Sequence, residues 1–113
     1  MTDDRYLLLH VLDACEIIHT ILTRDSRALF EDRILRDAIL RNLHTLTEST
    51  QKLSEDVKRR ASGVPWIDIG RFRNVVVHHY LGLDLVRIQR VIDEQLPVLE
   101  EAVRLLLKDY DET

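Results

Sequence analysis

The chain has few residues that interrupt secondary structure or form disulfide bonds. Its 113 residues include three glycines, two prolines and one cysteine, Cys15. With a single cysteine, neither an intrachain disulfide nor a cysteine-based zinc site can form, which fits a reducing compartment. So few glycines and prolines leave few places to turn, and we expect few, long elements. The length suits one domain over residues 1–113, with a modest core.

Membrane and secretion signals are also scarce. No apolar run approaches the ~20 residues that a membrane span needs. The acidic start, Met1-Thr2-Asp3-Asp4, is unlike the basic start of a signal peptide. We therefore expect a soluble cytoplasmic protein.

The charge balance is acidic, with a formal net charge of −4. The whole molecule should therefore not attract nucleic acid non-specifically. Among the 16 basic residues, however, 13 are arginine and 3 are lysine, and the planar guanidinium suits carboxylate and phosphate groups. Composition bias and ion pairs with the 20 acidic residues are the simpler explanation of this excess. Charge alone neither supports nor excludes a nucleic-acid partner.

Apolar residues recur every three or four positions and predict helices. The expected helices are 4–23, about 30–52, a short one at 54–60 with Ser54 as its N-cap, about 65–81, and one from 84 to a frayed tail at 108–113. Pro97 should kink the last of these. Val75-Val76-Val77 lowers helix propensity, but its helical flanks indicate that packing overrides this preference. The sum is an all-α bundle of four main helices plus a short extra helix.

The helix that follows Pro65 carries the polar residues hardest to explain as ordinary surface. On a helical wheel, Arg73 and Tyr80 share one stripe, and Asn74 and His78 form a second stripe beside it. Arg73 and His78 lie about 140° apart, so one straight helix could not easily direct both at one small group. A site that uses both should lie in a cleft between helices, or at an interface where a second copy supplies one residue.

Metal and covalent chemistry fit poorly. No histidine pair at i,i+4 with a nearby acid suggests zinc, and the Glu-x-x-His match at Glu16–His19 stands alone. There is no glycine-rich phosphate loop and no serine or cysteine nucleophile with an obvious base. We therefore expect no metal and no cofactor.

The remaining set of Arg, Asn, His and Tyr suits metal-independent RNA cleavage. A neutral histidine can take the proton of a ribose 2′-OH or return one to the leaving oxygen. An arginine can hold the phosphate and offset its growing charge. RNA carries its own nucleophile, so no serine, cysteine or metal is required. A satisfied polar contact on a buried helix explains the same residues without any catalysis.

The helix expected at 30–52 carries polar residues near its apolar stripe. Asp37 and Arg41 are spaced i,i+4 and could simply pair on the surface. Alternatively, Asp37 or Asn42 supports a site on the facing helix. The sequence leaves both interpretations open.

The order Arg73-x4-His78-x-Tyr80 resembles the R-x4-H-x-Y signature of the HepT-like toxins in the HEPN ribonuclease superfamily. Stretches similar to the family recur in the same order along nearly the whole chain, at 9–14, 30–33, 37–43, 64–66, 69–70, 82–84 and 96–97. The chain departs from the family pattern at Phe72, commonly Met, at Thr47-Glu48-Ser49, and at His44, a position that is often acidic.

The resemblance implies an all-helical homodimer that places the Arg and His of both subunits in a cleft at the dimer interface. It also implies an endonuclease that cuts tRNA or mRNA without metal and acts as a toxin. Arg73 would bind the phosphate and stabilise the transition state, His78 would act as acid and base, and Asn74 would support His78. Further candidates in the same cleft are Asp37, Arg41 and Asn42.

The resemblance implies a partner as well, a small nucleotidyltransferase antitoxin that attaches AMP to Tyr80. Because Tyr80 shares the Arg73 stripe, the added phosphate would occupy the arginine and crowd out RNA. The alternative is a catalytically silent HEPN-type module that dimerises and binds a nucleotidyltransferase; a plain helical scaffold is the third possibility. The intact Arg73 and His78 pair favours the nuclease. We expect no membrane and no DNA partner.

Overall fold

A computed structural model describes residues 3–78 and 84–111, of which 75–78 and 111 are described by their backbone only. These residues contain helices and no strand, which confirms the all-α prediction. In chain order the helices are α1 (Asp4–Arg24), α2 (Ala28–Glu31), α3 (Arg33–Lys52), α4 (Glu55–Arg60), α5 (Trp66–His78), α6 (Leu85–Glu94) and α7 (Leu96–Asp111).

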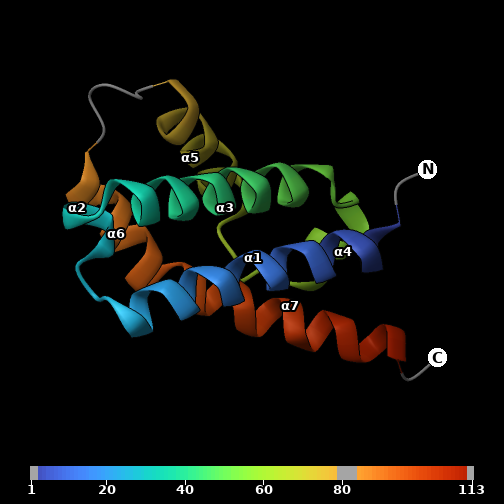
Figure 1. Cartoon of the computed structure of the whole chain (residues 1–113). Coiled ribbons are helices and arrows are strands. Elements are labelled where there is room, and N and C mark those ends of the chain that lie inside the picture. Colours follow the sequence, from blue (N-terminus) through green and yellow to red (C-terminus); the bar gives the residue numbers. More distant parts are fainter. Residues whose placement is uncertain (1–2, 79–83, 112–113) are drawn as a thin grey trace.

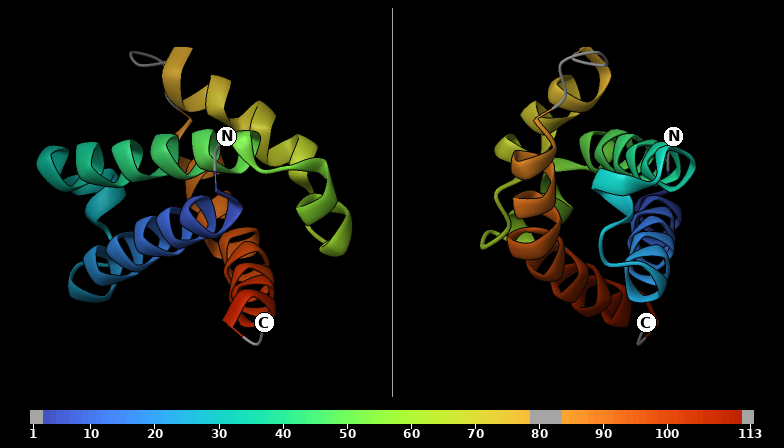
Figure 2. Two further views of the ribbon diagram at one scale, coloured as in Figure 1. Left: turned by 90° about the vertical axis from the view of Figure 1, so that its right-hand side faces the viewer. Right: turned by 60° about the vertical axis from the view of Figure 1, so that its left-hand side comes forward.

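Helix α1 lies between α3 and α7 and packs against both, running antiparallel to each of them (Figure 1). Helix α5 packs on α3, and α6, which leads into α7, lies across a groove from α5. Seen from two further directions, α1, α3, α5, α6 and α7 surround a common interior (Figure 2). The part of the chain that the structure describes therefore has one continuous apolar core.

The core is built from residues that are almost entirely shielded from water. Its largest fully buried side chains are Leu8, Val11, Ile18, Leu29, Ile39, Leu43, Leu46, Thr47, Val57, Ile88, Leu99 and Val103. They come from every helix except α5, which adds Ile69 and Phe72 at its margin. Burial of each such aliphatic side chain contributes about 1.5–3 kcal/mol, and this sum holds the short helices α2 and α4 in place.

Helix α3 begins three residues later than the sequence predicts, at Arg33 instead of Phe30. Asp32 adopts an extended conformation, and its carboxylate accepts hydrogen bonds from the amides of Ile34 and Leu35, as an N-cap does. The guanidinium of Arg36 donates to the carbonyl oxygens of Leu29 and Phe30 at 2.7 and 2.8 Å. Two polar side chains therefore separate α2 from α3 within an unbroken apolar pattern.

The last expected helix is kinked, as Pro97 predicts, and the kink divides it into α6 and α7. Gln95 ends α6, where its amide bonds the Val91 carbonyl at 2.9 Å, and its own carbonyl accepts from Leu99 at 3.0 Å. Pro97 lacks an amide hydrogen and lies in the first turn of α7, where that hydrogen would have no partner in the helix. The backbone bends at Gln95, which keeps both of its own backbone hydrogen bonds.

Ser54 links distant parts of the chain while it caps α4, as the sequence predicts. Its hydroxyl accepts from the Val57 amide and also donates to the Asp4 carboxylate at 2.7 Å. The Ser54 amide donates to the other oxygen of Asp4 at 2.9 Å. The end of α3, the start of α4 and the start of α1 are thereby joined.

Helix α1 is long and apolar enough to cross a membrane when only length and mean hydropathy are considered. It nevertheless buries one face, including Leu8, Val11, Cys15 and Ile18, against α3 and α7. Core helices pass the same test, so the hydropathy of α1 is explained by its place in the bundle.

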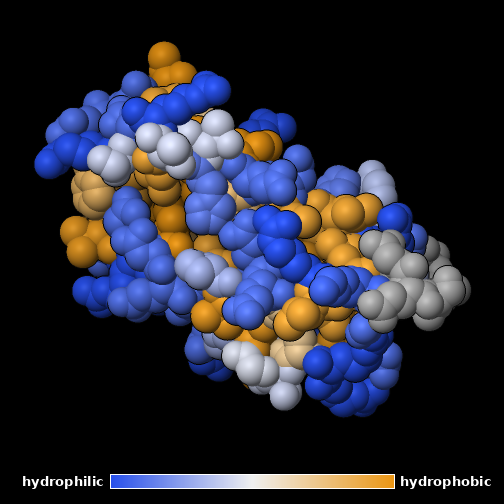
Figure 3. All heavy atoms as spheres, turned by 90° about the horizontal axis from the view of Figure 1, so that it is seen from below, coloured by the Kyte–Doolittle hydropathy of each residue, from blue (hydrophilic) through white to orange (hydrophobic). Residues whose placement is uncertain are grey.

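Apolar side chains also remain at the surface. Figure 3 shows apolar and polar side chains interspersed on the face seen from below. The large exposed apolar residues are Tyr6, Leu9, Ile17, Phe30, Ile34, Ile67, Val86, Val98 and Leu105. Ile34 and Ile67 are the most exposed, at 81% and 73%.

Candidate functional site

The motif helix α5 is held by its apolar face. Ile69 and Phe72 are only 4% and 5% exposed, and they meet Leu43 and Leu46 of α3 around a small apolar cavity. The backbone is helical through residues 75–77, which confirms that packing overrides the β-branched run. Since Phe72 faces inward, its neighbours Arg73 and Asn74 lie at the edges of the interface with α3.

Arg73 is fixed on the seam between α5 and α3. Its Nη2 donates to Oε1 of Glu48 at 3.2 Å, and both side chains are a little more than a third exposed, at 35% and 40%. The same Glu48 oxygen lies 3.4 Å from Nε2 of His44, one turn earlier on α3. Glu48 therefore joins Arg73 and His44 in a cluster, which we call the Arg73 cluster.

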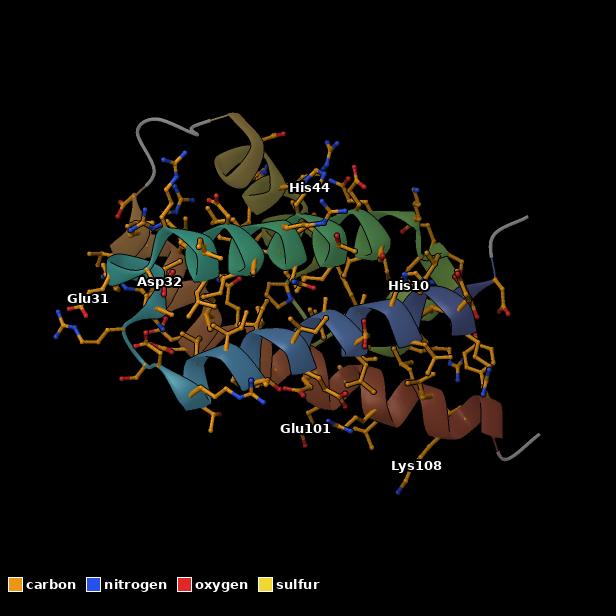
Figure 4. All side chains as sticks on the ribbon, in the orientation of Figure 1. His10, Glu31, Asp32, His44, Glu101 and Lys108 are labelled. Carbon is orange, nitrogen blue, oxygen red and sulfur yellow. The ribbon has the colours of Figure 1, made fainter. Side chains whose placement is uncertain are left out.

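Two nitrogen atoms of this cluster are buried without a hydrogen-bond partner among the described residues: Nε of Arg73 and Nδ1 of His44. A buried donor without a partner costs about 1–3 kcal/mol. Figure 4 shows His44 on the side of α3 that α5 covers. The cluster thus holds unused hydrogen-bonding capacity at the motif helix.

The two helices run antiparallel with a regular register. Nε2 of Gln51 donates to the Gly70 carbonyl at 3.3 Å, and three residues along each helix Glu48 meets Arg73. A Cβ at Gly70 would lie 3.2 Å from that Gln51 nitrogen, so glycine allows the close approach here. One turn further towards the start of α3 lies His44, which in this register is opposite the C-terminal part of α5.

The predicted residues on α3 separate into two groups. Asp37 and Arg41 are exposed and share the helical stripe of His44 and Glu48, and they do not pair with each other. Asn42 lies about 140° from Asp37 on the wheel. Its side-chain amide donates to the Ala38 carbonyl of its own helix at 2.8 Å. Asp37 and Arg41 therefore lie on the side of the cluster, and Asn42 does not.

The remaining motif residues are placed only in part. Asn74 is exposed and lines a groove between α4 and α5. His78 is the last residue of α5, and its side chain lies outside the described part. Tyr80 lies outside the described residues altogether. The predicted pairing of Arg73 with His78 therefore stays a prediction.

Sequence reasoning missed the partner of Arg73, Glu48, and the histidine that contacts Glu48 in turn, His44. Glu48 and His44 are spaced i,i+4 on α3, and this spacing was the available signal. It did not single them out, because many charged residues of this chain share that spacing. Only the register of α3 against α5 brings Glu48 to Arg73.

A groove of about 630 Å³ runs between α4 and α5. Trp66 lies in its wall, where the indole N–H is shared between the carbonyl oxygens of Lys58 and Ala61, at 3.1 and 3.0 Å. A second groove of about 390 Å³ separates α5 from α6 and contains Arg71, Arg87 and Arg90. Arg71 borders both grooves.

Within residues 3–78 and 84–111 the structure holds no group of three or more His, Cys, Asp or Glu side chains that could bind a metal ion. Cys15 lies on the buried face of α1 and has no disulfide partner. Burial, and next the nearby Glu100 carboxylate, raise the pKa of its thiol to about 12. Cys15 is therefore a core residue and not a nucleophile.

Comparison with known proteins matches residues 11–106 to the family model "Ribonuclease HepT-like". "Putative RNase TTE0752" of Caldanaerobacter subterraneus subsp. tengcongensis is 28% identical over 96% of this chain and 97% of its own length. "Probable ribonuclease HepT" of Thermococcus cleftensis is 27% identical over 85% and 91%.

A third relative, "Gamma-glutamylcyclotransferase and putative RNase MJ0434" of Methanocaldococcus jannaschii, is 24% identical over 96% of this chain. The chain spans only 50% of that relative's length. No solved structure gives a significant match to the chain.

Proposed function

The chain belongs to the ribonuclease HepT-like family, and on that premise we propose that it is a metal-independent RNA endonuclease. The observation that carries the proposal is the position of Arg73, which is anchored by Glu48 at 3.2 Å and lies on the same helix as His78. The matched segment, residues 11–106, includes this entire helix. Arg73 is the phosphate ligand and His78 is the acid and base.

The chemistry uses the nucleophile of the substrate. A neutral His78 takes the proton from a ribose 2′-OH, and the 2′ oxygen attacks the adjacent phosphorus. The bond from phosphorus to the 5′ oxygen breaks. The departing oxygen receives a proton from the imidazolium form of His78, which acts here as the acid. Arg73 binds the non-bridging oxygens, where negative charge grows in the transition state. The products are a cyclic phosphate and a free 5′ hydroxyl.

The active unit in this proposal is a homodimer. Because about 140° separates Arg73 from His78 on the wheel, one subunit supplies the arginine and its partner the histidine of one composite site. Asp37 and Arg41, on the Arg73 side of α3, are supporting residues.

The biological role that we propose is that of a cytoplasmic toxin, cutting tRNA or mRNA, with a nucleotidyltransferase as its antitoxin. AMP attached to Tyr80 silences it, because the phosphate pairs with the arginine that RNA needs. Resemblance to the family supports this part of the proposal.

One observation favours the alternative, a catalytically silent module that binds a nucleotidyltransferase. Glu48 already neutralises Arg73, and an arginine that is paired with a carboxylate attracts phosphate less. Only one of its five donors is used in this ion pair, however. Its Nε is buried, but the remaining Nη hydrogens can bind a phosphate, and we favour the nuclease.

The test is cleavage of bulk tRNA and of a mixed mRNA by the purified protein in excess EDTA, after mass spectrometry has shown Tyr80 to be unmodified. Arg73→Ala and His78→Ala should each slow cleavage by about 100-fold or more and relieve poisoning of cells. Asn42→Ala, on the opposite face of α3, is the control and should leave cleavage intact. Equal cleavage by all three variants would refute the catalytic assignment.

Silencing needs a separate experiment. Tyr80→Phe should cleave RNA like the wild type and escape inactivation by the nucleotidyltransferase with ATP. If the partner adds the same number of AMP groups to that variant, Tyr80 is not the acceptor.

A further inference from the structure

The groove between α4 and α5 carries chemistry that the motif does not explain. It is lined by Gln51, Glu55, Lys58, Arg59, Ser62, Trp66, Ile67, Gly70, Arg71 and Asn74. The groove has a volume of about 630 Å³ and is largely open to solvent, so it can admit an extended strand but does not enclose a ligand.

Its charge is opposite to that of the whole chain. Lys58, Arg59 and Arg71 face one acid, Glu55, in a protein whose formal net charge is −4. Within the described residues Arg71 forms no ion pair. A local excess of cations attracts anions to this surface even though the protein as a whole is acidic.

The two ion pairs inside or beside the groove are weak. Lys58 lies 3.8 Å from Glu55, and Arg59 lies 3.7 Å from Asp56. Both acids are almost fully solvated, with 83% and 73% of their side chains exposed. Such pairs form and break at little cost in free energy, so a phosphate can replace the carboxylates.

The groove also offers apolar surface beside its cations. Ile67 is 73% exposed although it is a large aliphatic residue, and Trp66 forms part of the wall. The two hydrogen bonds of the Trp66 indole to Lys58 and Ala61 fix that wall before any ligand arrives. Cationic side chains beside an apolar face suit a single nucleic-acid strand, whose bases stack while its phosphates pair.

The groove leads to the motif. Arg71 and Asn74 are neighbours on its α5 wall, and Asn74 lies one helical turn, about 6 Å, before His78. We propose that this groove binds the single-stranded RNA segment that flanks the scissile phosphate, with Lys58, Arg59 and Arg71 as phosphate ligands. This inference rests on the proposed function, since it assigns the path of that enzyme's substrate.

The test compares two charge-matched triple variants. The groove variant is Lys58→Gln, Arg59→Gln and Arg71→Gln; the control is Lys108→Gln, Arg24→Gln and Arg33→Gln, three exposed cations outside the groove. Lys108 projects from α7 on the side away from α5 (Figure 4). Arg71→Gln alone serves as a milder groove variant in case the triple variant folds poorly.

Binding is measured by fluorescence anisotropy with a single-stranded 2′-O-methyl RNA, which lacks the nucleophile and is not cut. Each lost phosphate contact lowers the salt slope of log K by about 0.7, which is roughly a fourfold loss of affinity at physiological salt. We expect about fourfold weaker binding for Arg71→Gln and about 50-fold for the groove variant. KM for a cleavable RNA should rise in proportion, with kcat unchanged, while the control variant stays within about twofold.

The possible failures can be told apart. Groove variants that bind and cleave like the wild type, while Arg73→Ala is inactive, would overturn the groove and leave the nuclease intact. A wild type that neither binds nor cleaves any RNA would overturn both. Groove variants that keep RNA affinity but no longer bind the nucleotidyltransferase would overturn the RNA assignment and show a protein interface.

Discussion

Removing the charge of Glu48 without removing its oxygen should tighten RNA binding. In Glu48→Gln the amide oxygen still accepts from Nη2 of Arg73, so the guanidinium keeps its place on the α3–α5 seam. What disappears is the repulsion between the Glu48 carboxylate and a phosphate on the other side of the guanidinium. At a separation of about 6 Å and near the dielectric constant of water, that repulsion is about 0.7 kcal/mol. We use this screened value because Glu48 is 40% exposed.

The expected result is a KM about threefold lower in Glu48→Gln, with kcat unchanged. Glu48→Ala removes the acceptor as well and leaves Arg73 free to change rotamer. A lost charge-assisted hydrogen bond of about 1.5 kcal/mol should therefore lower kcat about tenfold. Steady-state cleavage of one defined RNA by the three proteins separates these effects.

Two outcomes would contradict a purely positioning role of Glu48. If Glu48→Gln loses as much kcat as Glu48→Ala, the negative charge itself is required and the contact does more than position Arg73. If all three proteins cleave alike, Glu48 has no role at Arg73. Thermal unfolding is the control for both variants, because a partly exposed ion pair contributes only about 0–1 kcal/mol to stability.

Three predictions concern the fold. Leu43→Ala, at a fully buried position of α3, should lower the free energy of unfolding by about 2–5 kcal/mol in urea titrations, whereas the exposed neighbour Thr45→Ala should change it by less than about 0.5 kcal/mol. Ser54→Ala should cost about 1–2 kcal/mol in the same assay, since the α4 cap and the bond to Asp4 are both lost. The thiol of Cys15 should resist iodoacetamide at pH 8 until urea unfolds the protein, and a reaction at the rate of a free thiol would contradict its burial. Because its pKa rises from 9.0 to about 12 on folding, its contribution to stability is complete below pH 9 and is lost as the pH rises towards 12.

The sequence predicts the helices better than the contacts between them. The 3.6-residue pattern gives α1 to within a residue, and Ser54 correctly marks α4. It misplaces the start of α3, because Leu29, Phe30 and Leu35 keep the apolar spacing while Asp32 interrupts the backbone. Capping by a polar side chain at that point is a local event that apolar periodicity does not register.

The candidate site is likewise predicted in its residues but not in the contacts between its helices. The motif picks out Arg73 and the helical wheel picks out Asn74, and the structure leaves both at least partly exposed on α5. The partner Glu48 could not be predicted, because the register of two antiparallel helices depends on side-chain packing, here that of Phe72 and Ile69 against α3. The helical wheel alone puts Asn42 on another face than Asp37 and Arg41, but only the register shows which of these faces lies on the side of Arg73.

Trp66 is the only tryptophan in the chain, and its indole lies in the wall of the α4–α5 groove. Nearly all protein fluorescence that is excited at the long-wavelength edge of the ultraviolet absorption band therefore comes from Trp66. A nucleic-acid base that stacks beside the indole ring would quench this fluorescence. A loosened hydrogen bond to Lys58 or Ala61 would shift the wavelength of maximum emission. The molecule carries its own optical reporter at the surface where we propose that RNA enters, and occupancy of the groove can be followed without any label.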